Sequence, residues 1–254
     1  MKFSVVLATL AAVASAAPVQ DVEDGNSRLQ KRAAVFTAKT FDELSISGGN
    51  AGTAKEDALK KLGGLPTDLT AVDKADLTFL NSVNKIANQA ERGAYNAKIA
   101  ETTPGEEALA LQRAKIQNKV LKLTATVMGL QAQQAQGQNV TAKLDEETKK
   151  LNKNIAEDQA NAGKPATALK FNASTDNPAA SEVPKDDALA TKAGDVVKAS
   201  VKAAGGGGAG AAGGAKSTGK DKGTGKDKGT GTKSTKDKTK NKAVVADATE
   251  EDEE

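Results

Sequence analysis

The chain has 254 residues, a formal net charge of +3 and a hydrophobic content of 38%. It contains no histidine, cysteine or tryptophan, and aromatic residues make up 2% of it. Histidine-based triads, thiol nucleophiles, disulfides and the usual zinc and copper sites are therefore excluded. Aromatic stacking platforms for nucleic-acid bases are almost absent. We expect no cofactor, no metal and no nucleic-acid partner.

Residues 1–17 have the organisation of a signal peptide. Lys2 precedes an apolar run from Val5 to Val13, and small residues follow it at positions 14–17. The run is about half of the ~20 residues that a membrane-spanning helix needs, so we expect cleavage rather than anchoring. No later stretch is apolar enough to span a bilayer. We therefore predict a secreted, extracellular protein without an integral membrane anchor.

Residues 18–32 form a short polar segment that ends in the dibasic pair Lys31-Arg32. Such a pair at the end of a pro-segment is the form that a secretory-pathway protease recognises, so we predict that the mature chain begins at Ala33. The alternative is a pair of solvated charges on a linker. The sequons Asn139-Val140-Thr141 and Asn172-Ala173-Ser174 lie in segments predicted as loops, which makes Asn139 and Asn172 candidate N-glycosylation sites.

Residues 33–163 predict an all-α domain, a small antiparallel bundle of three to four helices. A strand-like alternation is confined to residues 41–46, and glycines interrupt it from Gly48 onward. A short helix is predicted over residues 54–62, where Gly63-Gly64 ends it. A second helix is predicted from about residue 73 to residue 100 on the helical spacing of its apolar residues. Gly93 costs this helix about 1 kcal/mol relative to alanine, so we expect a kink or fraying there.

A third helix is predicted from Thr103, because Thr103 and Glu106 have the spacing of a capping box and Pro104 suits the first helical position. Gly137 ends it. Its apolar stripe consists of Leu109, Ile116, Val120, Leu123, Val127 and Leu130.

A fourth helix is predicted over residues 141–162, before Gly163 and Pro165. Its apolar stripe is thin and consists of Leu144, Leu151 and Ile155. The adjacent acids Asp145, Glu146 and Glu147 precede Lys149 and Lys150, and we interpret them as a solvated face rather than a catalytic pair. Five glutamines between residues 131 and 138 indicate a hydrated helix end, with self-association as the alternative; the oligomeric state is not predicted.

After residue 163 the composition changes. Prolines and small polar residues predict a linker over residues 164–204, with one weak helix from about residue 187. Residues 205–254 are of low complexity and predict a long disordered tail. Its basic part, residues 216–242, holds ten lysines against three aspartates, and residues 247–254 hold six acids. The lysines are Lys216, Lys220, Lys222, Lys226, Lys228, Lys233, Lys236, Lys238, Lys240 and Lys242.

The basic part of the tail is a candidate for weak polyanion binding, to an acidic cell-wall polymer or an anionic surface. The alternative is a solubilising spacer, because aspartates interrupt the lysines and no aromatic residue accompanies them.

Two segments resemble a known group of proteins. They are the entry segment Phe41–Gly49 and the lysine-leucine helix over residues 115–125, which continues to a Gln-rich end at residues 131–137. Over about residues 36–137 the chain resembles small secreted proteins of filamentous ascomycete fungi. The resemblance implies secretion, a helical domain and a fungal source, and it implies no activity.

Three functional hypotheses follow. The preferred one is a secreted non-enzymatic protein that acts at the cell wall or at a host surface. The alternative is a helical-bundle carrier of a lipid or another small apolar ligand, because an alanine-rich interior leaves room for a cavity. The third is an enzyme that uses only carboxylates and lysines.

Overall fold

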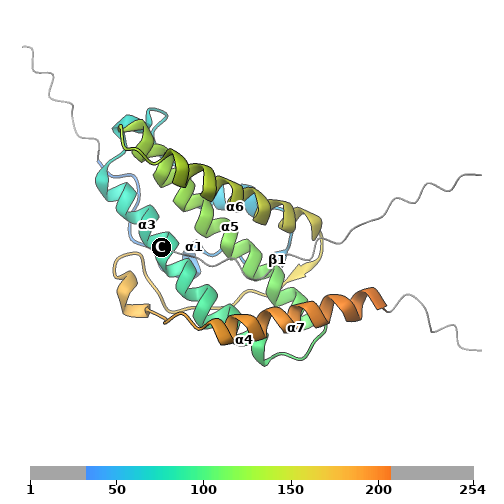
Figure 1. Cartoon of the computed structure of the whole chain (residues 1–254). Helices are drawn as coiled ribbons and strands as arrows, with labels where there is room; N and C mark the ends of the chain where they lie inside the picture. Colours follow the sequence, from blue (N-terminus) through green and yellow to red (C-terminus); the bar gives the residue numbers. More distant parts are fainter. Residues whose placement is uncertain (1–32, 207–254) are drawn as a thin grey trace, which may run out of the picture. The chain divides into compact units, whose positions relative to one another are not determined.

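The helices are the main elements of the computed structural model, which describes residues 33–206 (Figure 1). The signal peptide, the pro-segment with Lys31 and Arg32, and the tail lysines lie outside the described residues. Within residues 33–206 the all-α bundle is confirmed, and the two strands have two residues each. None of the described helices is both long and apolar enough to cross a membrane.

The first segment forms a short helix where the sequence shows a strand-like alternation. Helix α1 (Phe41–Leu44) has a capping box, in which the Thr40 hydroxyl accepts from the Glu43 amide and the Glu43 carboxylate accepts from the Thr40 amide. This reciprocal pair favours a helical turn over an extended strand. The strand β1 (Gly49–Asn50) follows.

Helix α2 (Ala54–Leu62) has the predicted bounds. Its first turn receives its cap from another helix, because Asp158 Oδ2 accepts from the amides of Gly52 and Ala54, both at 2.9 Å. The 3-10 turn η1 (Leu69–Ala71) leads to the next helix.

The second predicted helix is present but changes its hydrogen bonding in the middle. It consists of α3 (Lys74–Ala90), the π-helical segment η2 (Glu91–Asn96) and α4 (Ala97–Glu101). The irregular segment contains Gly93, where the sequence predicted a disturbance. A Cβ at Gly93 would lie 2.8 Å from Val183 Cγ2, so the absence of a side chain lets a later segment pack here.

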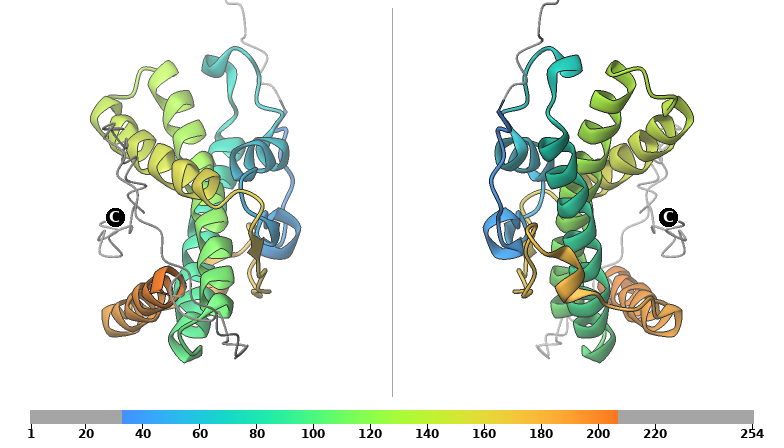
Figure 2. Two further views of the ribbon diagram at one scale, coloured as in Figure 1. Left: turned by 90° about the vertical axis from the view of Figure 1, so that its right-hand side faces the viewer. Right: turned by 90° about the vertical axis from the view of Figure 1, so that its left-hand side faces the viewer.

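Helix α5 (Glu106–Ala135) is the centre of the bundle, and it contacts α2, α3, α6 and α7 (Figure 2). The predicted capping box at Thr103 is wrong, because the helix begins after Gly105 without a side-chain cap. Glu106 binds Arg113 instead of reaching back to Thr103. Because neighbours surround α5, residues outside its predicted apolar stripe, such as Gln117 and Asn118, are also buried.

Helix α6 (Thr141–Ala160) follows a turn at Gly137, whose φ is +85°. Its predicted stripe, Leu144, Leu151 and Ile155, is only half-buried, while Asn154 and Asp158 are buried.

Residues 164–186 are packed on the bundle, so the prediction of a linker there is wrong, whereas the helix predicted from about residue 187 is present. The strand β2 (Pro165–Ala166) pairs antiparallel with β1, and Thr40 forms a bridge with Ser174. After the 3-10 turn η3 (Pro178–Ser181), helix α7 (Asp187–Gly206) packs against α4 and α5. Its Ser200 Oγ accepts from the Gly105 amide at 2.9 Å, which ties α7 to the loop before α5.

Candidate functional site

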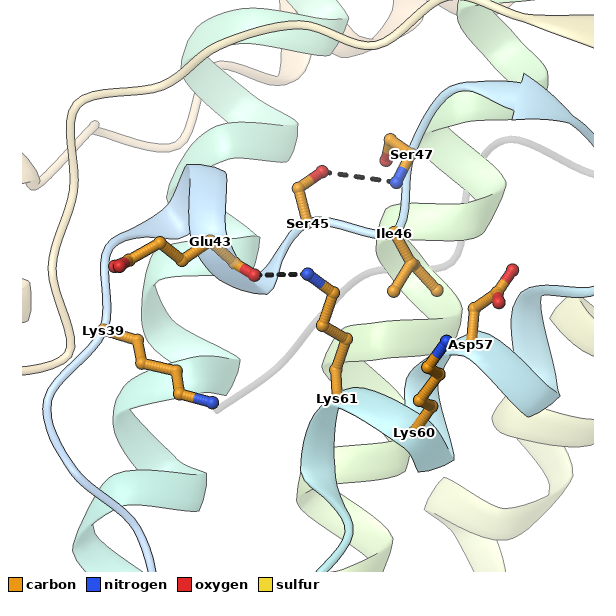
Figure 3. Close-up of a pocket in the computed structure, with 8 residues that line it drawn as sticks. All are labelled: Lys39, Glu43, Ser45, Ile46, Ser47, Asp57, Lys60 and Lys61. Carbon is orange, nitrogen blue, oxygen red and sulfur yellow. Dashed lines mark hydrogen bonds between the residues drawn. The ribbon is translucent and has the colours of Figure 1, made fainter.

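Among the hollows in the described part of the chain, two are large enough to hold a small molecule and differ in their lining. The first, of about 690 Å³, is a depression beside α1 and α2 (Figure 3). It is lined by Lys39, Glu43, Ser45, Ile46, Ser47, Asp57, Lys60 and Lys61. Ile46 is its single hydrophobic lining residue, and Lys61 donates to the Glu43 carbonyl across it. Its charged lining offers little apolar surface to a ligand.

The second hollow is a groove of about 820 Å³ between α3, α5 and α6, which we call the α3–α6 groove. Its apolar lining residues are Val72, Leu77, Leu80, Leu123, Ala125, Gly129, Leu130 and Val140. Its polar and charged lining residues are Lys74, Thr78, Asn81, Asn84, Asn88, Lys122, Thr126, Gln133, Gln136, Gln138, Lys143, Glu147 and Lys150. The groove therefore has an aliphatic floor and a rim of amides and lysines.

Three contacts fix the direction of α3 against α5 along the groove. Gln136 Nε2 donates to the Val72 carbonyl at 2.9 Å, Asn84 Nδ2 donates to Thr126 Oγ1 at 2.7 Å, and Lys122 Nζ donates to Asn88 Oδ1 at 3.3 Å. The two helices are antiparallel. One end of the groove thus lies at Val72 and Gln136, and the other at Asn88 and Lys122.

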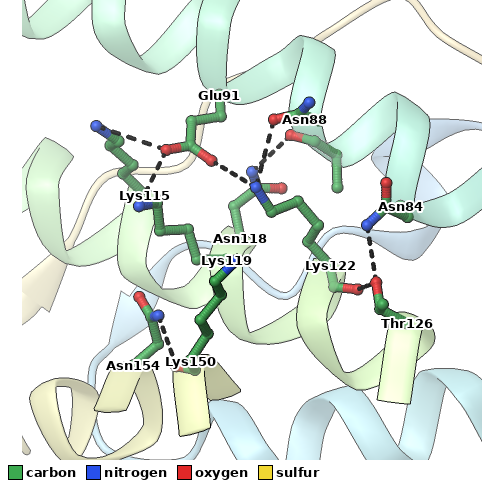
Figure 4. A network of polar contacts seen from close by, with 11 residues as sticks. Asn84, Asn88, Glu91, Lys115, Asn118, Lys119, Lys122, Thr126, Lys150 and Asn154 are labelled. Carbon is green, nitrogen blue, oxygen red and sulfur yellow. Dashed lines mark hydrogen bonds and ion pairs between the residues drawn. The ribbon is translucent and has the colours of Figure 1, made fainter. Parts of the chain in front are cut away.

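A buried charge cluster shares Lys122 with the second end of the groove (Figure 4). The Glu91 carboxylate lies among three ammonium groups of α5, at 3.7 Å from Lys115, 3.4 Å from Lys119 and 3.3 Å from Lys122. The three lysines share one face of α5 because their spacing is four and then three residues. Glu91 is the first residue of the π-helical segment and lies opposite this face. We call these four residues the Glu91 cluster.

Burial sets the electrostatics of the Glu91 cluster. The side chains of Glu91, Lys122 and Lys115 are 8%, 6% and 14% exposed. Burial opposes the charge on Glu91, but Lys119, Lys122 and Lys115 outweigh it and hold the pKa of this carboxyl well below its ordinary value. Burial also lowers the pKa of Lys115, against the attraction of Glu91. Positive charge is therefore concentrated in a poorly hydrated part of the protein.

The residues that the sequence singled out are not brought together. Asn139 and Asn172 are both exposed and both outside helices and strands, as a glycosylation site requires. Glu146 and Glu147 bind Lys150 at 2.9 and 3.3 Å, so this face of α6 forms ion pairs and no carboxylate pair. The processing pair and the ten tail lysines lie outside residues 33–206.

Sequence reasoning missed the Glu91 cluster. The available signal was three lysines on one face of a helix whose other positions are largely apolar, and their buried partner was a glutamate 24 residues before the first of them. Residues 33–206 contain no group of three or more acidic side chains that could hold a metal ion. The arrangement offers aliphatic surface, amide groups, ammonium groups and the Glu147 carboxylate to a ligand.

Comparisons with known proteins give a family without an assigned activity. A family model described as "Domain of unknown function (DUF8454)" matches residues 36–170, which is more than half of the chain. The match includes α3, α5, α6 and the α3–α6 groove, and ends before α7. No curated protein and no solved structure matches the chain.

Proposed function

We propose that this chain, which belongs to the DUF8454 family, is a non-enzymatic binding protein that holds a small amphiphilic molecule in the α3–α6 groove. The observation that carries the proposal is the groove itself, whose aliphatic lining adjoins the buried Glu91 cluster at Lys122. Among the hypotheses from the sequence, the carrier of a small apolar ligand is the one that this geometry supports best.

The size and lining of the groove support this function. Its volume of about 820 Å³ falls within the roughly 300–1,000 Å³ that is usual for small-molecule sites. Leu80, Leu123 and Leu130 are nearly buried in the floor, so an alkyl chain laid over them would remove mainly its own apolar surface from water. The amides of Asn84 and Asn88 offer hydrogen bonds at the rim.

Gly129 provides a direct test, because it lines the groove and a Cβ there would meet only Leu80, at 3.9 Å. In the full chain, Gly129→Leu places a large side chain on the floor, whereas Gly129→Ala is its matched control. The probe is a pyrene-labelled monoacylglycerol, which is amphiphilic and uncharged.

We expect saturable binding of the probe to the wild type and to Gly129→Ala, and at least tenfold weaker binding to Gly129→Leu, measured by fluorescence titration. Circular dichroism checks that the leucine variant remains folded. Absence of saturable binding to the wild type, or equal binding by a folded Gly129→Leu, would refute the proposed function.

A second proposal concerns the place of action. We infer from the signal-peptide pattern and the ten tail lysines that the protein is exported and associates weakly with an acidic polymer or surface. Counterion release by flexible lysines gives such binding a steep salt dependence. Deleting residues 216–242 should abolish the association and deleting residues 247–254 should strengthen it, in a pull-down with an acidic polysaccharide. Unchanged binding after the first deletion would contradict this role.

A further inference from the structure

Two asparagines of α3 line the α3–α6 groove one helical turn apart. Asn84 and Asn88 are both half-buried, and each makes a hydrogen bond to a residue of α5 (Figure 4). A side-chain amide has a donor end and an acceptor end of nearly the same shape, so its partners decide which end is left for a ligand. The partners of the two asparagines decide this in opposite ways.

Thr126 fixes the orientation of Asn84. The Thr126 hydroxyl donates its proton to the Lys122 carbonyl at 3.0 Å. A hydroxyl whose proton is engaged can only accept from a further partner, and accordingly Asn84 Nδ2 donates to Thr126 Oγ1 at 2.7 Å. The side-chain oxygen of Asn84, Oδ1, makes no hydrogen bond within residues 33–206, so it is an acceptor that a ligand can use.

Lys122 fixes the orientation of Asn88. An ammonium group has donors only, so Lys122 Nζ binds the oxygen of the Asn88 amide, at 3.3 Å. The NH2 group of Asn88 is thereby left to donate to a ligand. Lys122 is held in turn by the Glu91 carboxylate at 3.3 Å. The buried Glu91 cluster therefore orients a neutral donor of the groove.

A donor and an acceptor one helical turn apart match a headgroup with adjacent hydroxyls. Each hydroxyl can both donate and accept, so one can give its proton to Asn84 Oδ1 while the other accepts from Asn88 Nδ2. A phosphate dianion has acceptors only and cannot satisfy Asn84 Oδ1. The cation beside the pair, Lys122, already binds Glu91, so an anionic headgroup would compete with a buried carboxylate for it.

The apolar part of the groove lies on one side of the asparagine pair. Leu80 precedes Asn84 by one turn of α3, and a Cβ at Gly129 of α5 would lie 3.9 Å from it. The stretch of α3 from Lys74 to Asn84 is about 15 Å long at 1.5 Å per residue. An alkyl chain of medium length can lie along this stretch, toward the Val72 end of the groove.

We propose that the α3–α6 groove takes a neutral single-chain amphiphile whose headgroup carries adjacent hydroxyls, as in a glycerol ether or ester. One hydroxyl donates to Asn84 Oδ1, the other accepts from Asn88 Nδ2, and the alkyl chain lies over Leu80 toward Val72. This inference rests on the proposed function, and it adds the class of the headgroup and the direction in which the ligand lies.

The test compares three amphiphiles with the same chain: dodecyl glycerol ether, the same molecule with both hydroxyls methylated, and dodecyl phosphate. Methylation keeps both oxygens as acceptors and removes both donors, so it isolates the hydrogen bond to Asn84. Each ligand is titrated by calorimetry into the full chain, below its micelle concentration. The variants are Asn84→Leu and Asn88→Leu. Asn81→Leu is the matched control, because Asn81 is an exposed asparagine that lines the same groove on the same helix.

We expect the wild type and Asn81→Leu to bind dodecyl glycerol ether about fivefold more tightly than either of the other ligands, as one hydrogen bond allows. In Asn84→Leu the preference for the free hydroxyls over the methylated ones should fall below about twofold. Asn88→Leu should weaken both ethers by a similar factor, because both keep their acceptor oxygens. Circular dichroism checks that the variants remain folded, and the comparison of ligands on the wild type needs no variant.

The failures are distinguishable. Equal binding of the two ethers by the wild type overturns the hydroxyl inference and leaves the proposed function standing. Binding of dodecyl phosphate as tight as that of dodecyl glycerol ether does the same. A preference for the free hydroxyls that survives in a folded Asn84→Leu has its origin elsewhere in the chain and also overturns the inference. Absence of saturable binding by all three amphiphiles overturns both proposals.

Discussion

Asp158 provides a sharp test of how the bundle is held together. It is 2% exposed on α6, and its Oδ2 accepts hydrogen bonds from the amides of Gly52 and Ala54 at the start of α2. The preceding residue Thr53 makes no side-chain cap of its own. Asp158→Ala therefore leaves two amides at a helix start without their acceptor, and the amide of Ala54 is part of a buried contact.

The magnitude follows from the two bonds. A hydrogen bond to a charged acceptor contributes about 1.5 kcal/mol at the low end, so two give about 3 kcal/mol. For a domain of this size, that loss lowers Tm by roughly 6–12 °C. The matched control is Asp145→Ala, which removes an exposed aspartate from the same helix and should change the free energy of unfolding by less than about 0.5 kcal/mol.

Thermal and urea unfolding followed by circular dichroism measure both variants at neutral pH. A loss below about 1 kcal/mol for Asp158→Ala, or equal losses for the two aspartates, would refute the role of Asp158 as the cap of α2.

Four further predictions concern other parts of the fold. Glu91→Gln should lower the free energy of unfolding by about 3–5 kcal/mol at pH 7. Because the pKa of Glu91 is lowered, the stabilisation by its carboxylate is present above about pH 4.3 and is lost as pH falls below that value. The difference in Tm between Glu91→Gln and the wild type should therefore become smaller in acid. A difference in Tm that stays constant with pH would contradict the ion pairs. Leu123→Ala, at a site 4% exposed, should cost about 2–5 kcal/mol in urea unfolding, whereas Leu59→Ala, at a site 47% exposed, should cost little. Gly129→Ala should raise Tm, because the new Cβ lies 3.9 Å from Leu80, which is an ordinary contact. Gly93→Ala should lower Tm, because the new Cβ lies 2.8 Å from Val183. A change of Tm in the same direction for both variants would show that packing at Gly93 is not close. Limited proteolysis should leave a fragment that ends near residue 206, and a fragment that ends near residue 163 would mean that α7 does not stay docked.

The parts of the fold that were predicted correctly depend on neighbouring residues. Helix α2 ends before Gly63, and α6 is followed by a turn at Gly163, whose φ is +80°. The same Thr-x-x-Glu motif had opposite outcomes at two places. It forms a capping box at Thr40, but at Thr103 the glutamate binds Arg113 of its own helix. Local spacing therefore shows that a cap is available, and competition from other side chains decides whether it forms.

The parts that were missed depend on distant residues. Helix α5 is buried on nearly all sides because α2, α3, α4, α6 and α7 all contact it, and its own periodicity does not show this. Residues 164–186 have no helical or strand periodicity, yet Ala166 and Ala173 are buried against the bundle. The candidate site was missed for the same reason. Glu91 and Lys122 come from separate helices, and in the sequence each of them has the pattern of an ordinary surface charge.

Two segments that are far apart in the sequence, residues 39–41 and 173–175, pair with each other. This pairing limits the order in which the domain can fold during synthesis. Lys39 and Thr175 exchange hydrogen bonds although they are 136 residues apart, and the Phe41 amide donates to the Ala173 carbonyl. At about 5–20 residues per second, a ribosome needs roughly 7–27 s to make the chain between them. During that interval α3, α5 and α6 can associate through contacts between successive helices, while Lys39 and the Phe41 amide still lack their partners from residues 173–175. The bridge between Thr40 and Ser174 and the ring contact between Phe41 and Phe171 can therefore form only after the later segment has been made.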